Sequence, residues 1–244
     1  MTLAELRIFL AELICDTAFA GKSFFAGGCV RDELLRPGQD VLDADIAVEL
    51  ENGGVRLART LQKKLNTAPP EVPRGFGTAS LAWQGIQLDF VMTRSETYPP
   101  GSRHPRVKFA TLAQDCQRRD FTVNALYQEI LRGTTSDPCC RGFADLEARL
   151  IRSLREPNLS FQEDPLRMLR ALRFAAVLDF QIEPSTYSAI GQNAPLTGSL
   201  SRRRLDDELA RLREKCSPKG LERWREMLAE TGVGVYLERK VKLL

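Results

Sequence analysis

Strand-like and helix-like patterns occupy different parts of this 244-residue sequence. Strand-like alternation occurs early, in "SFFA", in "LDADIAVEL" and on both sides of Gln84-Gly85, a pair that predicts a hairpin turn. From about residue 160 onward, every long segment has helical spacing. Because strands and helices do not alternate, the sequence predicts an α+β fold, with a mixed α/β domain at 1–156 and an all-helical domain at 157–244.

Other segments of the first domain give local predictions. The N-terminal 25 residues mix Glu5, Arg7 and Glu12 with apolar residues, which indicates an amphipathic helix rather than a signal peptide. Helical spacing also predicts helices in "VRLARTLQKKL" and "RRDFTVNALYQEIL". Residues 95–117 contain three prolines, and we expect an exposed loop there.

The composition restricts the class of protein. Hydrophobic residues make up 43% and charged residues 27%, as in ordinary globular proteins. No apolar run approaches the roughly 18 residues that a membrane span needs, so no membrane partner is expected. The six cysteines show no CxxC spacing and the chain has one histidine, which argues against a zinc site and for reduced thiols in the cytoplasm.

Two aspartates, Asp43 and Asp45, lie on either side of one alanine in a strand-like segment. Residues two apart on a strand face the same side, so the two carboxylates project together. Such anions repel each other unless a cation lies between them, and oxygen ligands on a rigid strand suit Mg²⁺. Asp89 offers a third carboxylate if its strand neighbours the first. The alternative is that Asp43 and Asp45 are only the polar face of an edge strand.

A glycine pair, Gly27-Gly28, precedes a short helical segment and the Asp43 strand. Backbone N–H groups in such a turn can approach phosphate oxygens closely, and Arg31 adds a guanidinium fork suited to phosphate. A Gly-Gly turn alone is more often just a turn. Followed by the two aspartates, it predicts a triphosphate site beside a metal site.

The helical part carries arginines at regular intervals. Arg167, Arg170 and Arg173 recur every third residue beside a stripe of leucines, which predicts a basic flank on a packed helix. Asp164 precedes Pro165, so it can act either as a helix N-cap or as a functional group. Asp120, which follows Arg118 and Arg119, can likewise act as the N-cap of the helix predicted after it, in which case the two arginines are solvated.

Several motifs occur together in a familiar order: "GGCVRDELL", "DADIAV", "LDFVMTR", "RRDFTVNAL", "DPCCRGFADLEARLIR" and "EDPLRMLRALRFAA". Together they resemble bacterial class II tRNA nucleotidyltransferases, namely CCA-adding enzymes and the similar bacterial poly(A) polymerases. The resemblance covers about residues 20–180 and, more weakly, 201–212. It implies a nucleotidyltransferase head with a small mixed β-sheet and flanking helices, an all-helical neck, and a short remnant of a body region.

The resemblance also implies roles for individual residues. Asp43 and Asp45 would bind Mg²⁺, and Asp89 would be a third catalytic acid near the primer hydroxyl. The implied nucleotide-binding residues are Gly27, Gly28, Arg31, Arg119, Asp120, Asn124, Asp164, Arg167, Arg170 and Arg173. Among them, Asp164 and Arg167 would act as the template for the incoming base. An aspartate that accepts from an amino group beside an arginine that donates to a ring nitrogen suits cytosine and adenine, and mismatches uracil and guanine.

The implied activity is metal-dependent addition of C, A or both to tRNA 3′ ends from CTP and ATP. The alternatives are a poly(A) polymerase, an enzyme that adds only C or only A, and a catalytically idle RNA- or nucleotide-binding relative. We expect RNA contacts through Arg202, Arg203 and Arg204, although a solvated helix paired with nearby acids fits equally well.

The sequence departs from the family pattern in three places, one of which is a short loop after the first strands. Only residues 218–244 follow the neck, which puts a grip on the tRNA elbow and control of product length in doubt. The glycine pair usual after "DP" is replaced by Cys139-Cys140-Arg141. The sequence predicts no particular oligomeric state.

Overall fold

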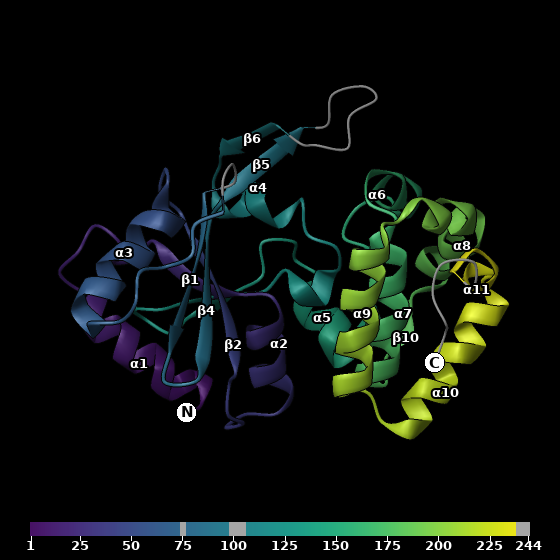
Figure 1. Ribbon diagram of the computed structural model, residues 1–244, viewed down its shortest axis with the longest axis horizontal. Coiled ribbons are helices and arrows are strands. Elements are labelled where there is room, and N and C mark those ends of the chain that lie inside the picture. The colour runs from purple at the N-terminus through teal and green to yellow at the C-terminus, as the bar shows by residue number, and fades with distance from the viewer. Residues whose placement is uncertain (74–76, 98–105, 238–244) are drawn as a thin grey trace. The chain divides into compact units, whose positions relative to one another are not determined.

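The computed structural model describes residues 1–73, 77–97 and 106–237. The chain divides into two compact units (Figure 1). Residues 1–119 and 124–143 form the first unit, and residues 120–123 with the chain from residue 144 onward form the second. The division into a catalytic head at 1–156 and a neck at 157–244 stays a prediction.

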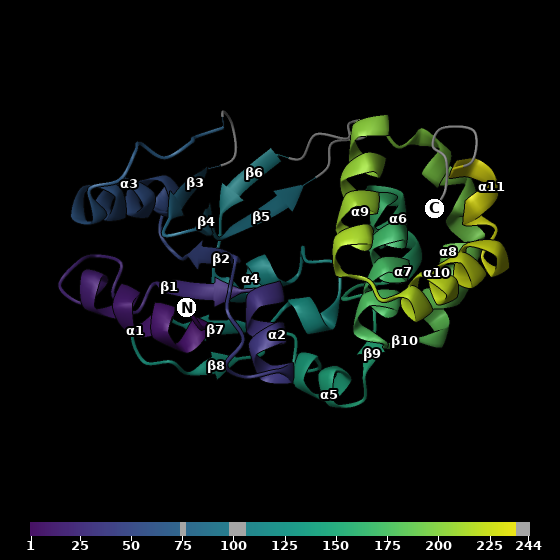
Figure 2. The ribbon, with the colours of Figure 1, turned by 60° about the horizontal axis from the view of Figure 1, so that its bottom comes forward.

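The first unit is built on a mixed six-stranded sheet, whose strands lie in the order β3-β4-β2-β1-β7-β8 (Figure 2). β2 and β4 are parallel, whereas the other neighbours are antiparallel. The strands are β1 (Ser23–Ala26), β2 (Asp43–Val48), β3 (Thr78–Trp83), β4 (Ile86–Met92), β7 (Tyr127–Glu129) and β8 (Thr135–Ser136). This architecture confirms the predicted α+β class, and the left-handed φ angles of Gln84 and Gly85 (47° and 79°) fit the predicted hairpin.

Helices cover the sheet where the sequence has an apolar stripe. The helices of this unit are α1 (Leu3–Ile14), α2 (Gly28–Leu35), α3 (Gly53–Leu65) and α4 (Leu112–Cys116). α3 packs on β2, β3 and β4 and buries Leu57, Ala58 and Leu61. A Cβ at Gly54 would lie 2.6 Å from the carbonyl oxygen of Gly77, so only glycine allows this close packing of helix on sheet.

Two predictions for this unit are wrong. The segment "RRDFTVNALYQEIL" forms a 3₁₀ turn, η1 (Thr122–Asn124), and strand β7 instead of a helix. Its apolar residues other than Leu131 are buried, and β7 pairs with β1, so tertiary packing outweighs the helical spacing. Much of the expected loop at 95–117 is ordered as the hairpin β5 (Arg94–Thr97) and β6 (Arg106–Phe109) and as α4. Residues 98–105 of that segment lie outside the described residues.

The second unit is mainly helical, as predicted. It contains most of α5 (Gly142–Glu147), then α6 (Pro157–Glu163), α7 (Leu166–Leu178), α8 (Pro184–Asn193), η2 (Ala194–Ser199), α9 (Arg202–Lys215), α10 (Pro218–Glu230) and α11 (Val233–Leu237). α7 is the central helix and contacts α6, α9 and α10. A small parallel pair, β9 (Leu150–Ile151) with β10 (Gln181–Ile182), interrupts the helices and was not predicted.

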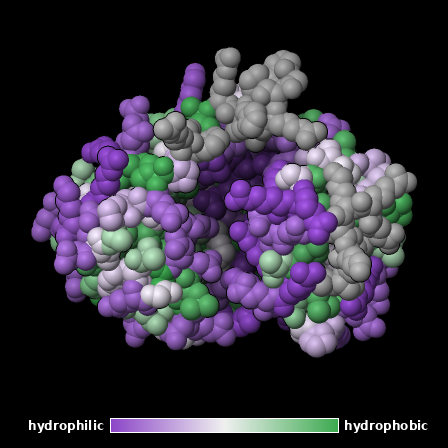
Figure 3. Space-filling model, viewed as in Figure 1, coloured by the Kyte–Doolittle hydropathy of each residue, from purple (hydrophilic) through white to green (hydrophobic). Residues whose placement is uncertain are grey.

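The visible surface of each unit is mostly hydrophilic, with hydrophobic residues in separate small patches (Figure 3). Within the described ranges, no helix combines the length and apolar character that a bilayer crossing requires.

Candidate active site

The predicted glycine turn joins β1 to α2. Gly27 has φ 75° and ψ −129°, a backbone conformation that residues other than glycine rarely adopt. Helix α2 begins at the next residue, Gly28. A Cβ at Gly27 would lie 3.1 Å from Nη1 of Arg119 and 3.7 Å from Oδ2 of Asp45. The absence of a side chain at Gly27 thus lets a guanidinium and a carboxylate both lie close to the backbone of the turn.

The three predicted carboxylates lie on one face of the sheet. Asp43 and Asp45 are both exposed on β2. The parallel register aligns Asp45 with Asp89 of β4, and residues in register share a face. The strand of Asp89 therefore neighbours the Asp43 strand, as the sequence analysis required. One oxygen of Asp89, Oδ1, accepts hydrogen bonds from Ser80 Oγ (2.5 Å) and Gln87 Nε2 (3.1 Å).

The donor set on this face fits a hard cation. Asp43 and Asp45 offer oxygen atoms from one strand, and Mg²⁺ in proteins is held by one or two carboxylates together with substrate phosphates and water. In the described part of the chain, no group of three or more His, Cys, Asp or Glu side chains is placed to share a metal ion. Asp43 and Asp45 are therefore the two carboxylates of this face that could hold such an ion.

Cys29, which the sequence analysis did not single out, lies beside these acids at the start of α2. Its thiol donates to the carbonyl oxygen of Ala26 at 3.4 Å. Burial, and then the negative charge of Asp45, raise the pKa of Cys29 to about 12. At neutral pH this sulfur is a protonated thiol, so it is a poor metal ligand.

Arg31 and Asn124 are two predicted nucleotide-binding residues that the fold brings together. Nη1 of Arg31 donates to Oδ1 of Asn124 at 2.5 Å, although the two residues are 93 positions apart in sequence. Nη2 of Arg31 also lies 2.8 Å from Asp32. Both Arg31 and Asn124 are buried, so their orientation is fixed by protein contacts before any ligand binds.

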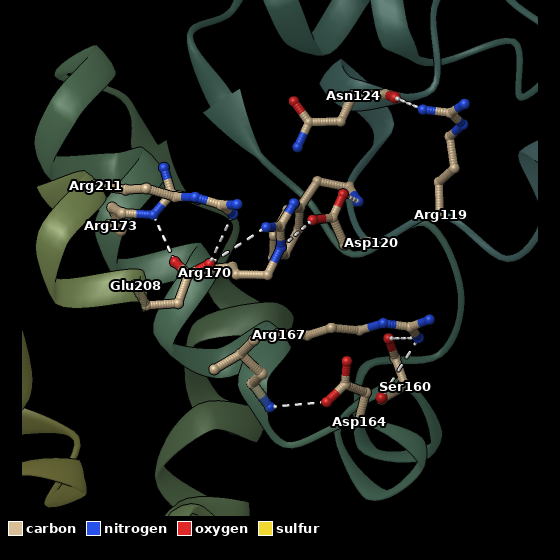
Figure 4. A network of polar contacts seen from close by, with 12 residues as sticks. Arg119, Asp120, Asn124, Ser160, Asp164, Arg167, Arg170, Arg173, Glu208 and Arg211 are labelled. Atoms are coloured by element: carbon tan, nitrogen blue, oxygen red, sulfur yellow. Dashed lines mark hydrogen bonds and ion pairs between the residues drawn. The ribbon is translucent and has the colours of Figure 1, made fainter. Parts of the chain in front are cut away.

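Arg119 is held by two residues that the sequence analysis missed, Tyr127 and Asp115, and by the backbone of Asn124. Its Nε donates to the hydroxyl of Tyr127 at 2.7 Å. Its Nη1 donates to the carbonyl oxygen of Asn124 at 3.3 Å (Figure 4). The Tyr127 hydroxyl in turn donates to the fully buried Asp115 at 2.9 Å. Burial acts to raise the pKa of Asp115, but the charges of Arg118 and Arg119 outweigh it and the pKa lies below its usual value. Asp115 therefore stays ionised and anchors the arginine pair.

In the second unit, the three arginines predicted as a basic flank of a packed helix lie on α7. Arg167 and Arg173 are buried, and all three arginines bind acceptors on other elements (Figure 4). Arg170 Nε donates to Asp120 Oδ2 at 2.7 Å, and Arg173 Nε donates to Glu208 Oε2 at 2.6 Å. Glu208 on α9 is also 3.4 Å from Arg170 Nη1, so one buried acid links two of the predicted nucleotide contacts.

Asp164 and Arg167, the predicted base template, have different partners in the structure. Asp164 lies between α6 and α7 and accepts a hydrogen bond from the backbone N–H of Leu166 at 3.2 Å, which resembles the capping alternative. Both of its carboxylate oxygens also accept from Nη2 of Arg204 at 2.9 Å. Arg167 Nη1 donates to Ser160 Oγ at 2.8 Å.

The predicted RNA contacts have partners of their own. Arg202 Nε donates to both carboxylate oxygens of Asp206, four residues later on α9, which is the pattern of the solvated-helix alternative. Arg204 binds Asp164, as above, and Arg203 is exposed. Asp120, predicted as a helix cap or nucleotide contact, precedes no α-helix and instead pairs with Arg170.

A glycine turn beside carboxylates on one sheet face is typical of sites for phosphoryl transfer. A family model described as "Poly A polymerase head domain" matches residues 23–152. A second, "Probable RNA and SrmB- binding site of polymerase A", matches residues 179–237. The chain therefore belongs to the poly(A) polymerase head-domain family of nucleotidyltransferases.

Individual relatives agree with this family. The mitochondrial CCA tRNA nucleotidyltransferase of Saccharomyces cerevisiae is 35% identical over 76% of this chain and 37% of its own length. The A-adding tRNA nucleotidyltransferase of Aquifex aeolicus is 38% identical over 77% of this chain and 22% of its own length. A solved structure of the Bacillus stearothermophilus CCA-adding enzyme in complex with CTP superposes with a TM-score of 0.76 at 30% identity, over 97% of this chain and 54% of that one. The chain thus spans about half or less of the length of these proteins.

Proposed function

We propose that this chain catalyses, or forms the catalytic part of a protein that catalyses, addition of C, A or both to tRNA 3′ ends from CTP and ATP. The RNA 3′-hydroxyl attacks the α-phosphate of the nucleotide, a P–O bond to the β-phosphate breaks, and pyrophosphate leaves. The observation that carries the proposal is the alignment of Asp45 with Asp89 on the face that also bears Asp43, beside the bare turn at Gly27. The CCA-adding and A-adding relatives support the choice of reaction.

The residues of the first unit bind and orient the reactants. The bare turn at Gly27–Gly28 lies against the phosphate oxygens, and Arg119, fixed by Tyr127, supplies a guanidinium beside the turn. Asp43 and Asp45 would hold Mg²⁺, which when bound balances the triphosphate charge and lowers the pKa of the attacking hydroxyl. Asp89, whose one oxygen is held by Ser80 and Gln87, positions that hydroxyl through its carboxylate.

Base selection belongs to the second unit. Asp164 and Arg167 recognise an amino group beside a ring-nitrogen acceptor, an arrangement that cytosine and adenine share. In the structure, Arg204 donates hydrogen bonds to the carboxylate of Asp164, and Arg167 donates one to the hydroxyl of Ser160. Selection therefore requires that Asp164 share or exchange its contact with Arg204 when the base arrives. We further propose that Arg203 contacts RNA phosphates, since it is exposed on α9.

Nucleotide incorporation tests the proposal directly. Purified protein with Mg²⁺ is incubated with tRNA that lacks its 3′-terminal CCA and with labelled CTP or ATP, and the products are separated at single-nucleotide resolution. We expect incorporation of C or A but not of U or G, and loss of incorporation in Asp43→Asn. Asp40→Asn removes an exposed carboxylate that pairs with the N-terminus, and serves as the matched control. No incorporation by the wild-type protein, or equal incorporation by Asp43→Asn and wild type, contradicts the proposal.

A narrower activity, addition of A alone, is the second candidate. The Aquifex aeolicus relative, at 38% identity, is an A-adding enzyme, and the family model is named for poly(A) polymerase. Three RNA substrates separate the possibilities: tRNA without CCA, tRNA that ends in CC, and an unrelated oligonucleotide. Extension by one A of tRNA ending in CC, with no use of CTP, favours the A-adding activity, whereas a long ladder of A on any RNA favours poly(A) synthesis.

A further inference from the structure

Ser160, a buried serine of α6, contacts both residues of the proposed base template. Its hydroxyl accepts a hydrogen bond from Arg167 Nη1 at 2.8 Å, and its carbonyl oxygen accepts from the same nitrogen at 3.4 Å (Figure 4). That carbonyl oxygen also accepts from the backbone N–H of Asp164 at 3.2 Å. One residue of α6 therefore connects the acid and the arginine on which base selection depends.

The hydrogen bond between Ser160 and Arg167 is shielded from water. The two residues are 2% and 8% exposed, and a hydrogen bond from a charged donor is stronger than one between neutral groups. Arg167 Nη1 also lies 3.6 Å from Glu163 Oε2, but 27% of the Glu163 side chain is exposed and its carboxylate also pairs with Arg155. The buried hydroxyl of Ser160 is thus the firmer of these two side-chain contacts with Nη1.

We propose that Ser160 is a positioning residue that determines base specificity: its hydroxyl holds the Arg167 guanidinium in the orientation that accepts cytosine and rejects uracil. The inference rests on the proposed function and deepens it, because Ser160 acts on selection through Arg167 and does not itself bind the base. The sequence analysis did not single out Ser160, since one serine in a helix gives no signal of its own.

The chemistry of the two pyrimidines explains why the orientation of the guanidinium matters. The ring nitrogen N3 of cytosine accepts a hydrogen bond, whereas N3 of uracil carries a hydrogen, and arginine can only donate. A fixed guanidinium therefore pairs with cytosine, but with uracil it brings two donors together and leaves both unpaired. A guanidinium that can turn loses part of the bond to cytosine and avoids part of the conflict with uracil. Loss of the Ser160 hydroxyl should thus weaken the preference for CTP from both sides.

Equilibrium binding tests the inference without any catalysis. The affinities of the full chain for CTP and for UTP are measured by isothermal titration calorimetry with Mg²⁺ and without RNA. We expect wild type to bind CTP more tightly than UTP. Ser160→Ala should reduce the CTP-to-UTP ratio of affinities by roughly 3- to 10-fold, because one hydrogen bond is lost while Glu163 and the Ser160 carbonyl still contact Arg167.

A matched control and the choice of readout separate positioning from general damage. Ser188 is an exposed serine of α8 whose hydroxyl also accepts from a side chain, Gln192 Nε2, at 3.1 Å. Ser188→Ala should leave the ratio of affinities unchanged. The ratio is the informative quantity, because a variant that only loosens the fold lowers both affinities alike.

A double variant shows whether Ser160 acts through Arg167. Arg167→Met gives the ratio that remains without the guanidinium, and Ser160→Ala/Arg167→Met should give the same ratio. An unchanged ratio in Ser160→Ala overturns the inference, and so does a ratio in the double variant that falls below that of Arg167→Met. Equal affinities of wild type for CTP and UTP also overturn it. Incorporation of C or A into tRNA would stand in each of these cases, so the inference and the proposed function can fail separately.

Discussion

The link between Glu208 and two arginines of α7 gives the sharpest prediction for stability. Glu208 and Arg173 are 5% and 6% exposed, and their ion pair is 2.6 Å long. Burial outweighs the carboxylate and lowers the pKa of Arg173, so this guanidinium depends strongly on its partner. Arg170 depends less on Glu208 for its counter-charge, because Asp120 also pairs with it. Removal of the acid therefore leaves Arg173 as a buried cation without its main counter-charge.

The change is Glu208→Gln, which keeps the size of the side chain and removes its charge. Breaking a buried ion pair from one side costs about 3–5 kcal/mol, and we expect the lower value because the glutamine oxygen still accepts a hydrogen bond. For a protein of this size, about 3 kcal/mol corresponds to a fall in Tm of roughly 6–12 °C. Denaturant unfolding followed by circular dichroism measures the free energy, and a thermal scan measures Tm.

Two controls make the measurement specific to the pair. Glu214→Gln removes an exposed acid from the same helix, and should change the free energy of unfolding by less than about 0.5 kcal/mol. In the double variant Glu208→Gln/Arg173→Met, both charges of the pair are gone, and the loss should be smaller than the sum of the single losses. A single-variant loss below about 1 kcal/mol, or strict additivity in the double variant, would refute the reasoning.

Three further predictions concern the turn, a helix cap and the base template. Gly27→Ala should abolish nucleotide incorporation with the fold retained by circular dichroism, whereas Gly38→Ala, at a φ of 80° with no atom within 4 Å of its Cβ, should leave incorporation unchanged. Glu183 caps α8, and the hydrogen bonds that it accepts lower its pKa from 4.5 to about 2 against the effect of burial. Because the folded pKa is depressed, its contribution to stability is full above 4.5 and is lost as the pH falls toward 2, so Glu183→Gln should flatten the acid limb of a stability–pH curve. Arg204→Met removes the partner of Asp164, and should lower the ratio of CTP to UTP incorporation in a product ladder; an unchanged ratio speaks against a role of Arg204 in base selection.

The sequence predicted those features that depend on local pattern. Alternation identified the strand that carries Asp43 and Asp45, and the glycine pair identified the turn at Gly27. The register of Asp45 with Asp89 was only a condition in the sequence analysis, because 40 or so residues of chain separate the two strands and no local rule sets their pairing.

The misassigned elements share a physical cause. Segment 118–131 has helical spacing, but its apolar residues other than Leu131 are buried among other elements and its second half pairs with β1. Likewise, the spacing of the α7 arginines predicted which face of the helix they share. It did not predict the acids that pair with them, since Glu208 lies 35 positions after Arg173. Asp115 and Tyr127 were missed because an ordinary Asp or Tyr gives no signal until the fold places it against Arg119.

The path of the chain between the two units limits how this protein can be divided. Residues 120–123 belong to the second unit although first-unit residues flank them on both sides. Within the second unit, Phe121 stacks edge-on against Phe174, and Thr122 donates to Asp145. A fragment that stops at residue 143 keeps residues 120–123 but lacks their partners Phe174 and Asp145. It would therefore expose Phe121, which is fully buried in the whole chain. No single cut in the backbone separates the units cleanly, and a deletion that spares one necessarily damages the other.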